Sequence, residues 1–193
     1  MKNYELKLPD NYREAFVVDA TDKKLAVTLN VVNLIIAAAV ILISWLLIRP
    51  QNLMESLSLS DYLIFMGCLL CYLVLHELVH GAAYKLLTRQ KLTFGLTLSV
   101  AYCGVPDIYV YRRASMISLL APFCVFTVVF GVAVFLMPTP QEQFCAAILL
   151  ALHWGGCVGD LYDTFLYLTR FRSPLTLMRD TGPKQTFYLP QES

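Results

Sequence analysis

DYLIFMGCLLCYLVLHELVHGAAYKLL, residues 61–87, is a nearly continuous apolar run. A helix needs roughly 20 such residues to cross a bilayer. The run also carries two histidines and a glutamate, namely His76, Glu77 and His80. Ionisable side chains are costly in hydrocarbon, and they occur there mainly where they serve a function. The stretch therefore predicts a membrane helix that carries a functional site.

The composition indicates lipid as the main solvent of the chain. Of its 193 residues, 58% are hydrophobic and only 15% are charged, whereas about a quarter of the residues in a soluble domain are charged. One small core cannot bury so much apolar surface. The net charge of +1 gives no reason to expect nucleic acid as a partner. We therefore expect membrane lipid, and no nucleic acid, among the partners.

Four runs are long and apolar enough to span a bilayer: residues 25–48, 61–87, 114–137 and 143–168. They predict an all-α integral membrane protein with four transmembrane helices. The length of the chain favours a single domain, residues 1–193, with its four-helix core at residues 25–168. Residues 1–24 and 169–193 are then two polar tails.

The basic residues predict how these helices are oriented. Lysine and arginine are enriched in cytoplasmic connections. Of the 15 basic residues, all but Arg49 lie in the two tails or between the second and third helices. We therefore expect a multi-pass protein of the cell membrane with both termini in the cytoplasm.

The connection between the second and third helices has the period of β-structure. In residues 92–102, apolar side chains alternate with small or polar ones, which is typical of a strand. Residues 104–107 predict a turn and residues 108–111 a second strand, so a small β-hairpin is expected there. Two further short strands and a solvated turn are expected at residues 14–19, 185–189 and 179–180.

The pentapeptide HELVH, residues 76–80, fits the pattern H-E-x-x-H. Residues four apart share a helix face, so His76 and His80 can bind one metal ion, and neutral imidazole is a good ligand of Zn²⁺. Glu77 can take a proton from a metal-bound water, whose pKa the metal lowers to around 7. A purely structural histidine pair would not require this spacing. The motif therefore predicts two zinc ligands and a general base.

A third ligand must come from elsewhere, because catalytic zinc usually has three protein ligands. The fourth predicted helix contains ALHWGGCVGDLYDTF, with His153, Asp160 and Asp163, and its glycines permit close approach of another helix. Counted from the basic residues at the cytoplasmic helix ends, the aspartates lie about 10.5–15 Å deep and the two histidines of the motif about 7.5–13.5 Å. These depths are similar, so spacing leaves both aspartates as candidates.

Five segments occur in order along the chain: HELVHG, FGLTLSVAYCGVP, SLLAP, GGCVGDLY and RDTG. Together they resemble a family of small bacterial membrane proteins described as "putative zincin peptidases", allied to the site-2 intramembrane metalloproteases. The likeness covers about residues 23–188. In site-2 proteases an aspartate on a later membrane helix is the third zinc ligand, so the resemblance implies Asp160. Where such families often carry an oxyanion-stabilising asparagine, this chain has His153, which could donate the same hydrogen bond or serve as an extra ligand.

The resemblance also gives the predicted hairpin a role. Site-2 proteases are similar in having a membrane-associated strand near the metal, thought to receive substrate. An extended peptide that adds to a strand edge gains main-chain hydrogen bonds and exposes its scissile bond. The alternative is that residues 92–111 form only a covering loop.

Residues and resemblance together predict an intramembrane zinc metalloprotease. His76, His80 and Asp160 are expected to bind Zn²⁺, Glu77 to activate water, and His153 to assist the oxyanion. The expected substrates are membrane-associated peptides or unwound transmembrane segments. Two alternatives stay open: a metal-binding transporter or sensor, and an inactive protease homologue that binds clients. A transporter would need a polar path, and no polar stripe crosses the first and third predicted helices.

Overall fold

The computed structural model describes residues 2–96 and 101–191, which form two compact units. The sheet unit comprises Met1–Val27, Glu77–Pro122 and Gly159–Ser193, and the helix unit comprises Thr28–His76 and Phe123–Val158. Three long helices contribute residues to both units: α1 (Lys23–Ile48), α3 (Leu59–Thr88) and α4 (Arg112–Leu136).

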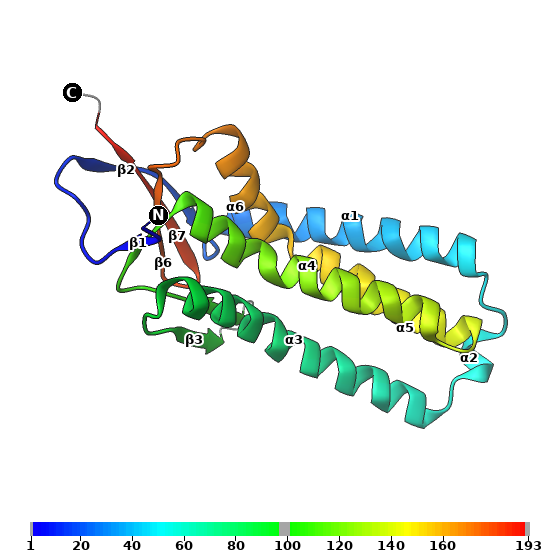
Figure 1. Cartoon of the computed structure of the whole chain (residues 1–193). Helices are drawn as coiled ribbons and strands as arrows, with labels where there is room; N and C mark the ends of the chain where they lie inside the picture. Colours follow the sequence, from blue (N-terminus) through cyan, green and yellow to red (C-terminus); the bar gives the residue numbers. More distant parts are fainter. Residues whose placement is uncertain (1, 97–100, 192–193) are drawn as a thin grey trace. The chain divides into compact units, whose positions relative to one another are not determined.

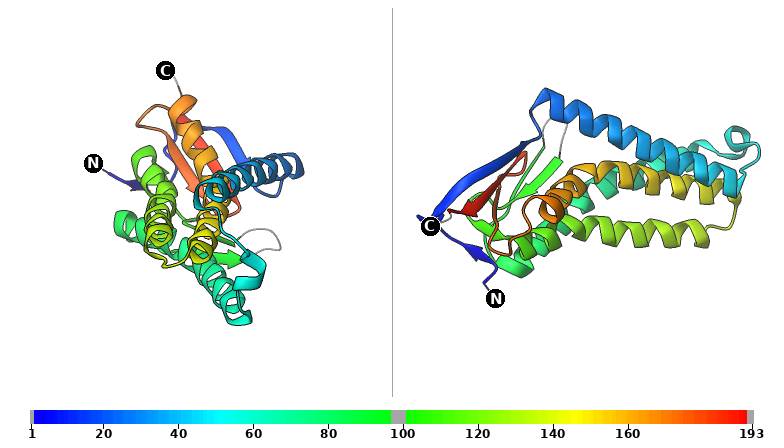
Figure 2. Two further views of the ribbon diagram at one scale, coloured as in Figure 1. Left: turned by 90° about the vertical axis from the view of Figure 1, so that its right-hand side faces the viewer. Right: turned by 90° about the horizontal axis from the view of Figure 1, so that it is seen from above.

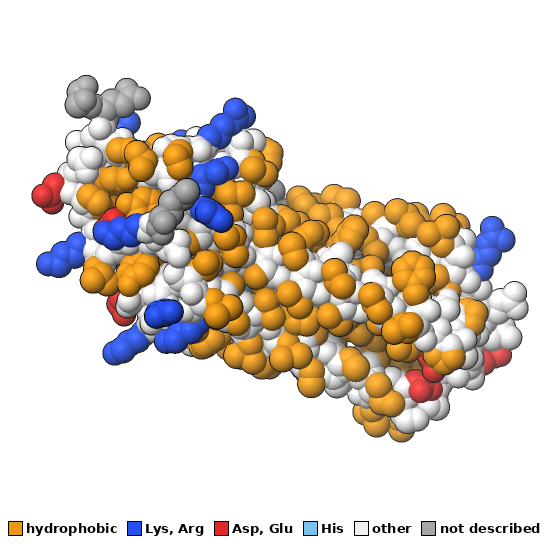
Figure 3. Space-filling view, in the orientation of Figure 1, with side chains coloured by type: hydrophobic (Ala, Val, Ile, Leu, Met, Phe, Trp, Pro, Cys, Tyr) orange, Lys and Arg blue, Asp and Glu red, His pale blue; other side chains and the backbone are white. Residues whose placement is uncertain are grey.

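Long apolar helices dominate the described part of the chain (Figure 1). Within residues 2–96 and 101–191, α1, α3 and α4 are each long and apolar enough to cross a membrane. Helices α5 (Pro140–Gly156) and α6 (Val158–Thr169) form a bent pair, which adds a fourth crossing if the pair counts as one broken span. Helix α2 (Leu53–Ser56) is short. Figure 3 shows hydrophobic side chains over the visible face of the long helices, and Lys and Arg side chains gathered over the sheet unit. These helices are compatible with a membrane protein.

The fourth predicted helix, residues 143–168, is interrupted at Cys157, so that α5 and α6 are separate helices. Helix α5 ends at two glycines, and the N–H of Cys157 donates to the carbonyl of His153. Gly155 is buried against α1, where an added Cβ would overlap the side chain of Asn33. Glycine therefore permits the close approach of α1 and α5 within the helix unit, and the same glycines weaken the helix at its end.

An antiparallel sheet of five strands organises the described part of the sheet unit (Figure 2). The strand order is β1-β5-β6-β7-β2, with β1 (Tyr4–Glu5), β2 (Tyr12–Asp19), β5 (Tyr109–Tyr111), β6 (Leu177–Asp180) and β7 (Lys184–Pro190). Strands β2 and β7 confirm the strands predicted at residues 14–19 and 185–189. The all-α fold class predicted from the sequence does not include this sheet. The described part of the chain is mostly helical, with small antiparallel sheets. The sheet packs on α4 and α6 through a core that includes Leu119, Tyr167, Phe171, Met178 and Phe187.

A two-stranded hairpin lies between α3 and α4, but its pairing differs from the predicted one. Strand β3 (Thr93–Leu96) pairs with β4 (Ala101–Gly104), whereas β5 pairs with β1 and β6. The predicted pairing of residues 92–102 with residues 108–111 is therefore wrong. The burial of apolar side chains explains the difference. Val105, Ile108 and Val110 pack with Tyr84 in one core cluster, and this packing places β5 in the larger sheet. Residues 97–100 of the predicted strand lie outside the described residues.

Residues 179–180 are the last two residues of strand β6 and Asp180 is buried, so the solvated turn predicted there is wrong. Asp180 is only 3% exposed, and it accepts hydrogen bonds from the Tyr84 hydroxyl at 2.7 Å and the Gly182 N–H at 2.9 Å. Burial raises the pKa of the Asp180 carboxyl to about 6, against the lowering effect of these hydrogen bonds. The φ of Gly182 is 96°, a conformation that favours glycine. The hydrogen bond from Tyr84 to Asp180 thus links α3 to strand β6 within the sheet unit.

Candidate metal centre

The buried face of α3 is polar, whereas much of its exposed face is apolar. Side chains such as Leu70 and Val74 are mostly exposed. The buried side chains recur every fourth residue and so share one helix face: Tyr72, His76, His80, Tyr84 and Thr88. This pattern reverses that of a soluble amphipathic helix. It is typical of a membrane helix whose ionisable groups face away from lipid and serve a function.

In the sheet unit, His80 contacts an acidic side chain of α6. Its Nε2 atom lies 3.3 Å from Oδ2 of Asp160, in the first turn of that helix. The spacing of the sequence did not separate Asp160 from Asp163, but the carboxylate that contacts His80 is that of Asp160. Asp163 is buried farther along α6, and its Oδ1 forms no hydrogen bond to any described residue.

The other ring nitrogen of His80 contacts the backbone of α4. Its Nδ1 lies 2.8 Å from the carbonyl oxygen of Ser118. A carbonyl can only accept, so Nδ1 carries a proton, and Nε2, which faces the Asp160 carboxylate, is the ring nitrogen that could bind a metal ion. In a regular helix the Ser118 carbonyl would accept from the N–H four residues later, but that residue is Pro122, which has no N–H. Pro122 therefore leaves the Ser118 carbonyl available to orient His80.

These contacts fit a zinc ion. Bonds of about 2.0–2.1 Å at tetrahedral angles place a nitrogen and an oxygen ligand about 3.3 Å apart, which matches the separation of His80 Nε2 and Asp160 Oδ2. Zinc-binding histidines usually donate their second N–H to a carbonyl or a carboxylate, as His80 does to Ser118. The donor set of the sheet unit is therefore suited to Zn²⁺.

Glu77 is half-buried on the part of α3 that packs on the β3–β4 hairpin. Burial raises the pKa of the Cys103 thiol in β4 to about 12, and the nearby carboxylates of Asp180 and Glu77 add to this rise. One helical turn after Glu77, an added Cβ on Gly81 would lie 2.7 Å from the ring of Phe94 in β3. The hairpin and the Glu77 carboxylate therefore lie in the same region of the sheet unit.

In the helix unit, His76 belongs to a chain of hydrogen-bonding groups. Its Nδ1 lies 3.2 Å from the Tyr72 hydroxyl, which lies 3.0 Å from Nδ1 of His153. The Nε2 atom of His153 lies 3.2 Å from the carbonyl oxygen of Phe123, which can only accept. His153 is therefore protonated on Nε2, so Tyr72 donates to His153 and accepts from Nδ1–H of His76. This arrangement leaves Nε2 of His76 as its metal-binding nitrogen.

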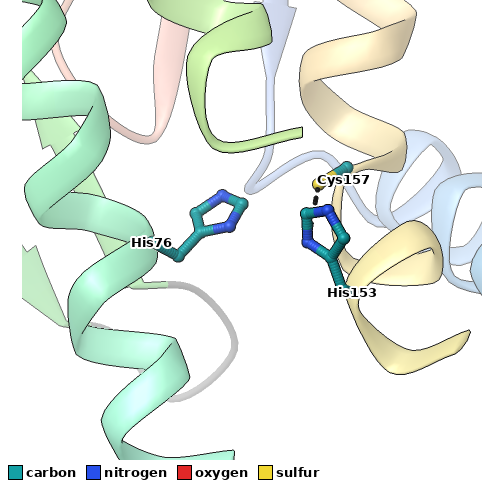
Figure 4. Close-up of side chains that lie close together, drawn as sticks. All are labelled: His76, His153 and Cys157. Carbon is teal, nitrogen blue, oxygen red and sulfur yellow. Dashed lines mark hydrogen bonds between the residues drawn. The ribbon is translucent and has the colours of Figure 1, made fainter. Parts of the chain in front are cut away.

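Cys157 is a neighbour of His153 that the sequence-based site does not include. Its Sγ lies 3.5 Å from Nδ1 of His153, and ligand atoms of His76, His153 and Cys157 all lie within 4.8 Å of one another (Figure 4). The available signal was the four-residue spacing of His153 and Cys157, which places them on one helix face. The Nε2–H of His153 donates to the Phe123 carbonyl, so Nδ1 is the ring nitrogen that faces Cys157, and the oxyanion role of His153 stays a prediction.

Comparison with known protein families assigns the chain to one of them. Residues 69–174, more than half of its length, match the family described as "putative zincin peptidase". The chain belongs to this family. No curated protein and no solved structure matches it. The segment that matches the zincin family contains the HELVH motif, both hairpin strands, Asp160 and Cys157. Membership suggests a metallopeptidase that uses zinc.

Proposed function

We propose that the protein is an intramembrane zinc metallopeptidase that hydrolyses peptide bonds of membrane-associated substrates. The observation that carries this proposal is the contact between His80, in an H-E-x-x-H motif, and Asp160 of a separate helix. The zincin family match and the long apolar helices support it.

The metal ligands in this proposal are His76, His80 and Asp160. His76 precedes His80 by four residues on the continuous helix α3, and Tyr72 contacts Nδ1 of His76, so Nε2 is the nitrogen that would bind the metal. Ser118 likewise engages Nδ1 of His80, so Nε2, beside Asp160, is the nitrogen that would bind the metal. When bound by these residues, zinc would polarise a peptide carbonyl and lower the pKa of a water molecule to around 7.

Glu77 acts as the general base and acid. It follows the first ligand histidine directly, and its carboxylate would accept the proton of the attacking water and then deliver it to the leaving amine. Both transfers occur on one carboxylate, so no net proton is consumed by the residue.

The β3–β4 hairpin is the proposed substrate platform. Phe94 and Leu96 of β3 are exposed, and the hairpin lies on α3 close to Glu77. A substrate unwound into an extended segment would add to a strand edge and gain main-chain hydrogen bonds. The four crossings, with both termini in the cytoplasm as the basic residues predict, would place this platform on the cytoplasmic side.

The test is the substitution Glu77→Gln in protein reconstituted into lipid vesicles. With a panel of fluorogenic transmembrane peptides as the probe, we expect zinc content to stay at the wild-type level and cleavage to fall by at least about 100-fold. Glu55→Gln, at an exposed position in α2, is the matched control and should cleave at the wild-type rate.

Cleavage that persists in Glu77→Gln protein would contradict the general-base role. Zinc binding by wild-type protein that cleaves no peptide of the panel would instead favour a metal sensor, a transporter or an inactive homologue.

A further inference from the structure

We propose that His76, His153 and Cys157 form a second metal site, which contains a thiolate and lies wholly within the helix unit. Its preferred ions would be soft or borderline cations such as Zn²⁺ and Cd²⁺, because thiolate and imidazole are their favoured ligands. This site differs from the peptidase site in its cysteine, and it shares only His76 with that site.

The burial and spacing of the three side chains suit a bound cation. His76 is 8% exposed, and His153 and Cys157 are fully buried. Metal bonds of about 2.3 Å to sulfur and 2.0–2.1 Å to nitrogen at tetrahedral angles place these atoms about 3.5 Å apart. The distance from Cys157 Sγ to His153 Nδ1 is 3.5 Å, and the closest ring nitrogens and the sulfur all lie within 4.8 Å of one another.

The surroundings of His153 prepare it to act as a ligand. Its Nε2–H donates to the Phe123 carbonyl, and Nε2 also lies 3.3 Å from the Thr127 hydroxyl, which accepts from the Trp154 indole N–H. These contacts fix the ring and place the lone pair on Nδ1, which faces Cys157. Partners of this kind are what orient the histidine ligands of metals in proteins.

Tyr72 supplies an oxygen next to both imidazoles. Its hydroxyl lies 3.0 Å from His153 Nδ1 and 3.2 Å from His76 Nδ1. A cation bound to Nδ1 of His153 would take the lone pair to which Tyr72 now donates, so the hydroxyl oxygen becomes available as a further ligand. The donor set would then contain nitrogen, sulfur and oxygen, all from buried side chains.

Because His76 is common to both donor sets, the test must separate the two. Asp160→Ala removes the carboxylate of the proposed peptidase set and leaves the helix-unit cluster intact. In the full-length Asp160→Ala protein, purified in detergent, Co²⁺ should produce a near-ultraviolet thiolate-to-cobalt charge-transfer band. The peptidase set has no thiolate, so it cannot give this band.

Two double variants assign the band to one cysteine. Adding Cys157→Ser to Asp160→Ala should remove the band and weaken Cd²⁺ binding at least about tenfold, the scale on which lost metal partners act. Adding instead Cys145→Ser, a half-buried cysteine of α5 outside the cluster, should leave both unchanged. A band that survives Cys157→Ser, or that is absent from Asp160→Ala protein, would overturn the proposal.

X-ray absorption of zinc bound to Asp160→Ala protein gives a second readout that needs no cysteine variant. We expect one sulfur neighbour at about 2.3 Å, and coordination by nitrogen and oxygen alone would overturn the site. Neither readout involves peptide cleavage, so the absence of peptidase activity would not change either result.

Discussion

Pro122 lacks a backbone N–H, and this absence affects the proposed metal ligand His80. Because it has no N–H, the Ser118 carbonyl is left to accept from His80. Pro122→Ala would restore a helical N–H that competes for this carbonyl, so we expect zinc affinity to fall by about tenfold. Chelator competition on the purified protein would measure the change.

The matched control is Pro138→Ala, since Pro138 lies outside the helices in the connection after α4. Equal zinc affinities in wild-type, Pro122→Ala and Pro138→Ala proteins would show that the Ser118 carbonyl does not tune the metal site.

Asp180 should give the sheet unit a measurable dependence on pH. Burial raises the pKa of its carboxyl from 3.8 to about 6, so the folded state binds the proton more tightly than the unfolded state. The ionised carboxylate therefore destabilises the fold above pH 6. This penalty, about 3 kcal/mol, is relieved as the pH falls from 6 towards 3.8. Other titratable groups adjoin Asp180, namely His80, Tyr84, Cys103, Asp163 and Tyr167.

The measurement is the free energy of unfolding in detergent between pH 4 and pH 7, for wild-type and Asp180→Asn proteins. We expect the wild-type protein to gain stability relative to the variant as the pH falls. If the free energy of unfolding changed equally with pH in both proteins, a group other than Asp180 would cause the pH dependence between pH 4 and pH 7.

At the scale of elements, the contact of α1 with α5 depends on Gly155. An added Cβ there would overlap Asn33, whereas an added Cβ at Gly131 of α4 meets nothing within 4 Å. Gly155→Ala should destabilise the helix unit by about 1–3 kcal/mol through overpacking. Gly131→Ala should stabilise it by up to about 1 kcal/mol through helix propensity. Thermal unfolding in detergent compares the pair, and a Gly155→Ala protein as stable as Gly131→Ala would contradict the close packing.

The elements could be predicted where a local pattern determines them. The apolar runs gave α1, α3 and α4, and the short β-rich segments near the ends gave β2 and β7. The break at Cys157 could not be predicted from hydropathy, because the run stays apolar while glycine packing ends α5. The pairing of β5 was missed because burial beside Tyr84 decides it, and such long-range contacts leave no local period.

At the scale of the whole molecule, the candidate site was predictable in part. The H-E-x-x-H spacing indicates His76, Glu77 and His80 without any structure, and the resemblance rather than the spacing pointed to Asp160. The roles of Ser118 and Pro122 depend on a backbone carbonyl, which no sequence motif records. Cys157 and Tyr72 join the histidines only through packing within the helix unit. The sequence thus indicates ligands better than the groups that orient them.

The proposed zinc site of His76, His80 and Asp160 is tested most directly by X-ray absorption of zinc-loaded wild-type, Asp160→Ala and Asp163→Ala proteins. At one equivalent of zinc we expect the ion bound by nitrogen and oxygen alone in the wild-type and Asp163→Ala proteins, because Asp160 is the carboxylate that contacts His80 and His76 can serve only one of the two donor sets at a time. This form of bound zinc should be lost in Asp160→Ala. Its persistence in Asp160→Ala protein, or its loss in Asp163→Ala protein alone, would contradict the assignment.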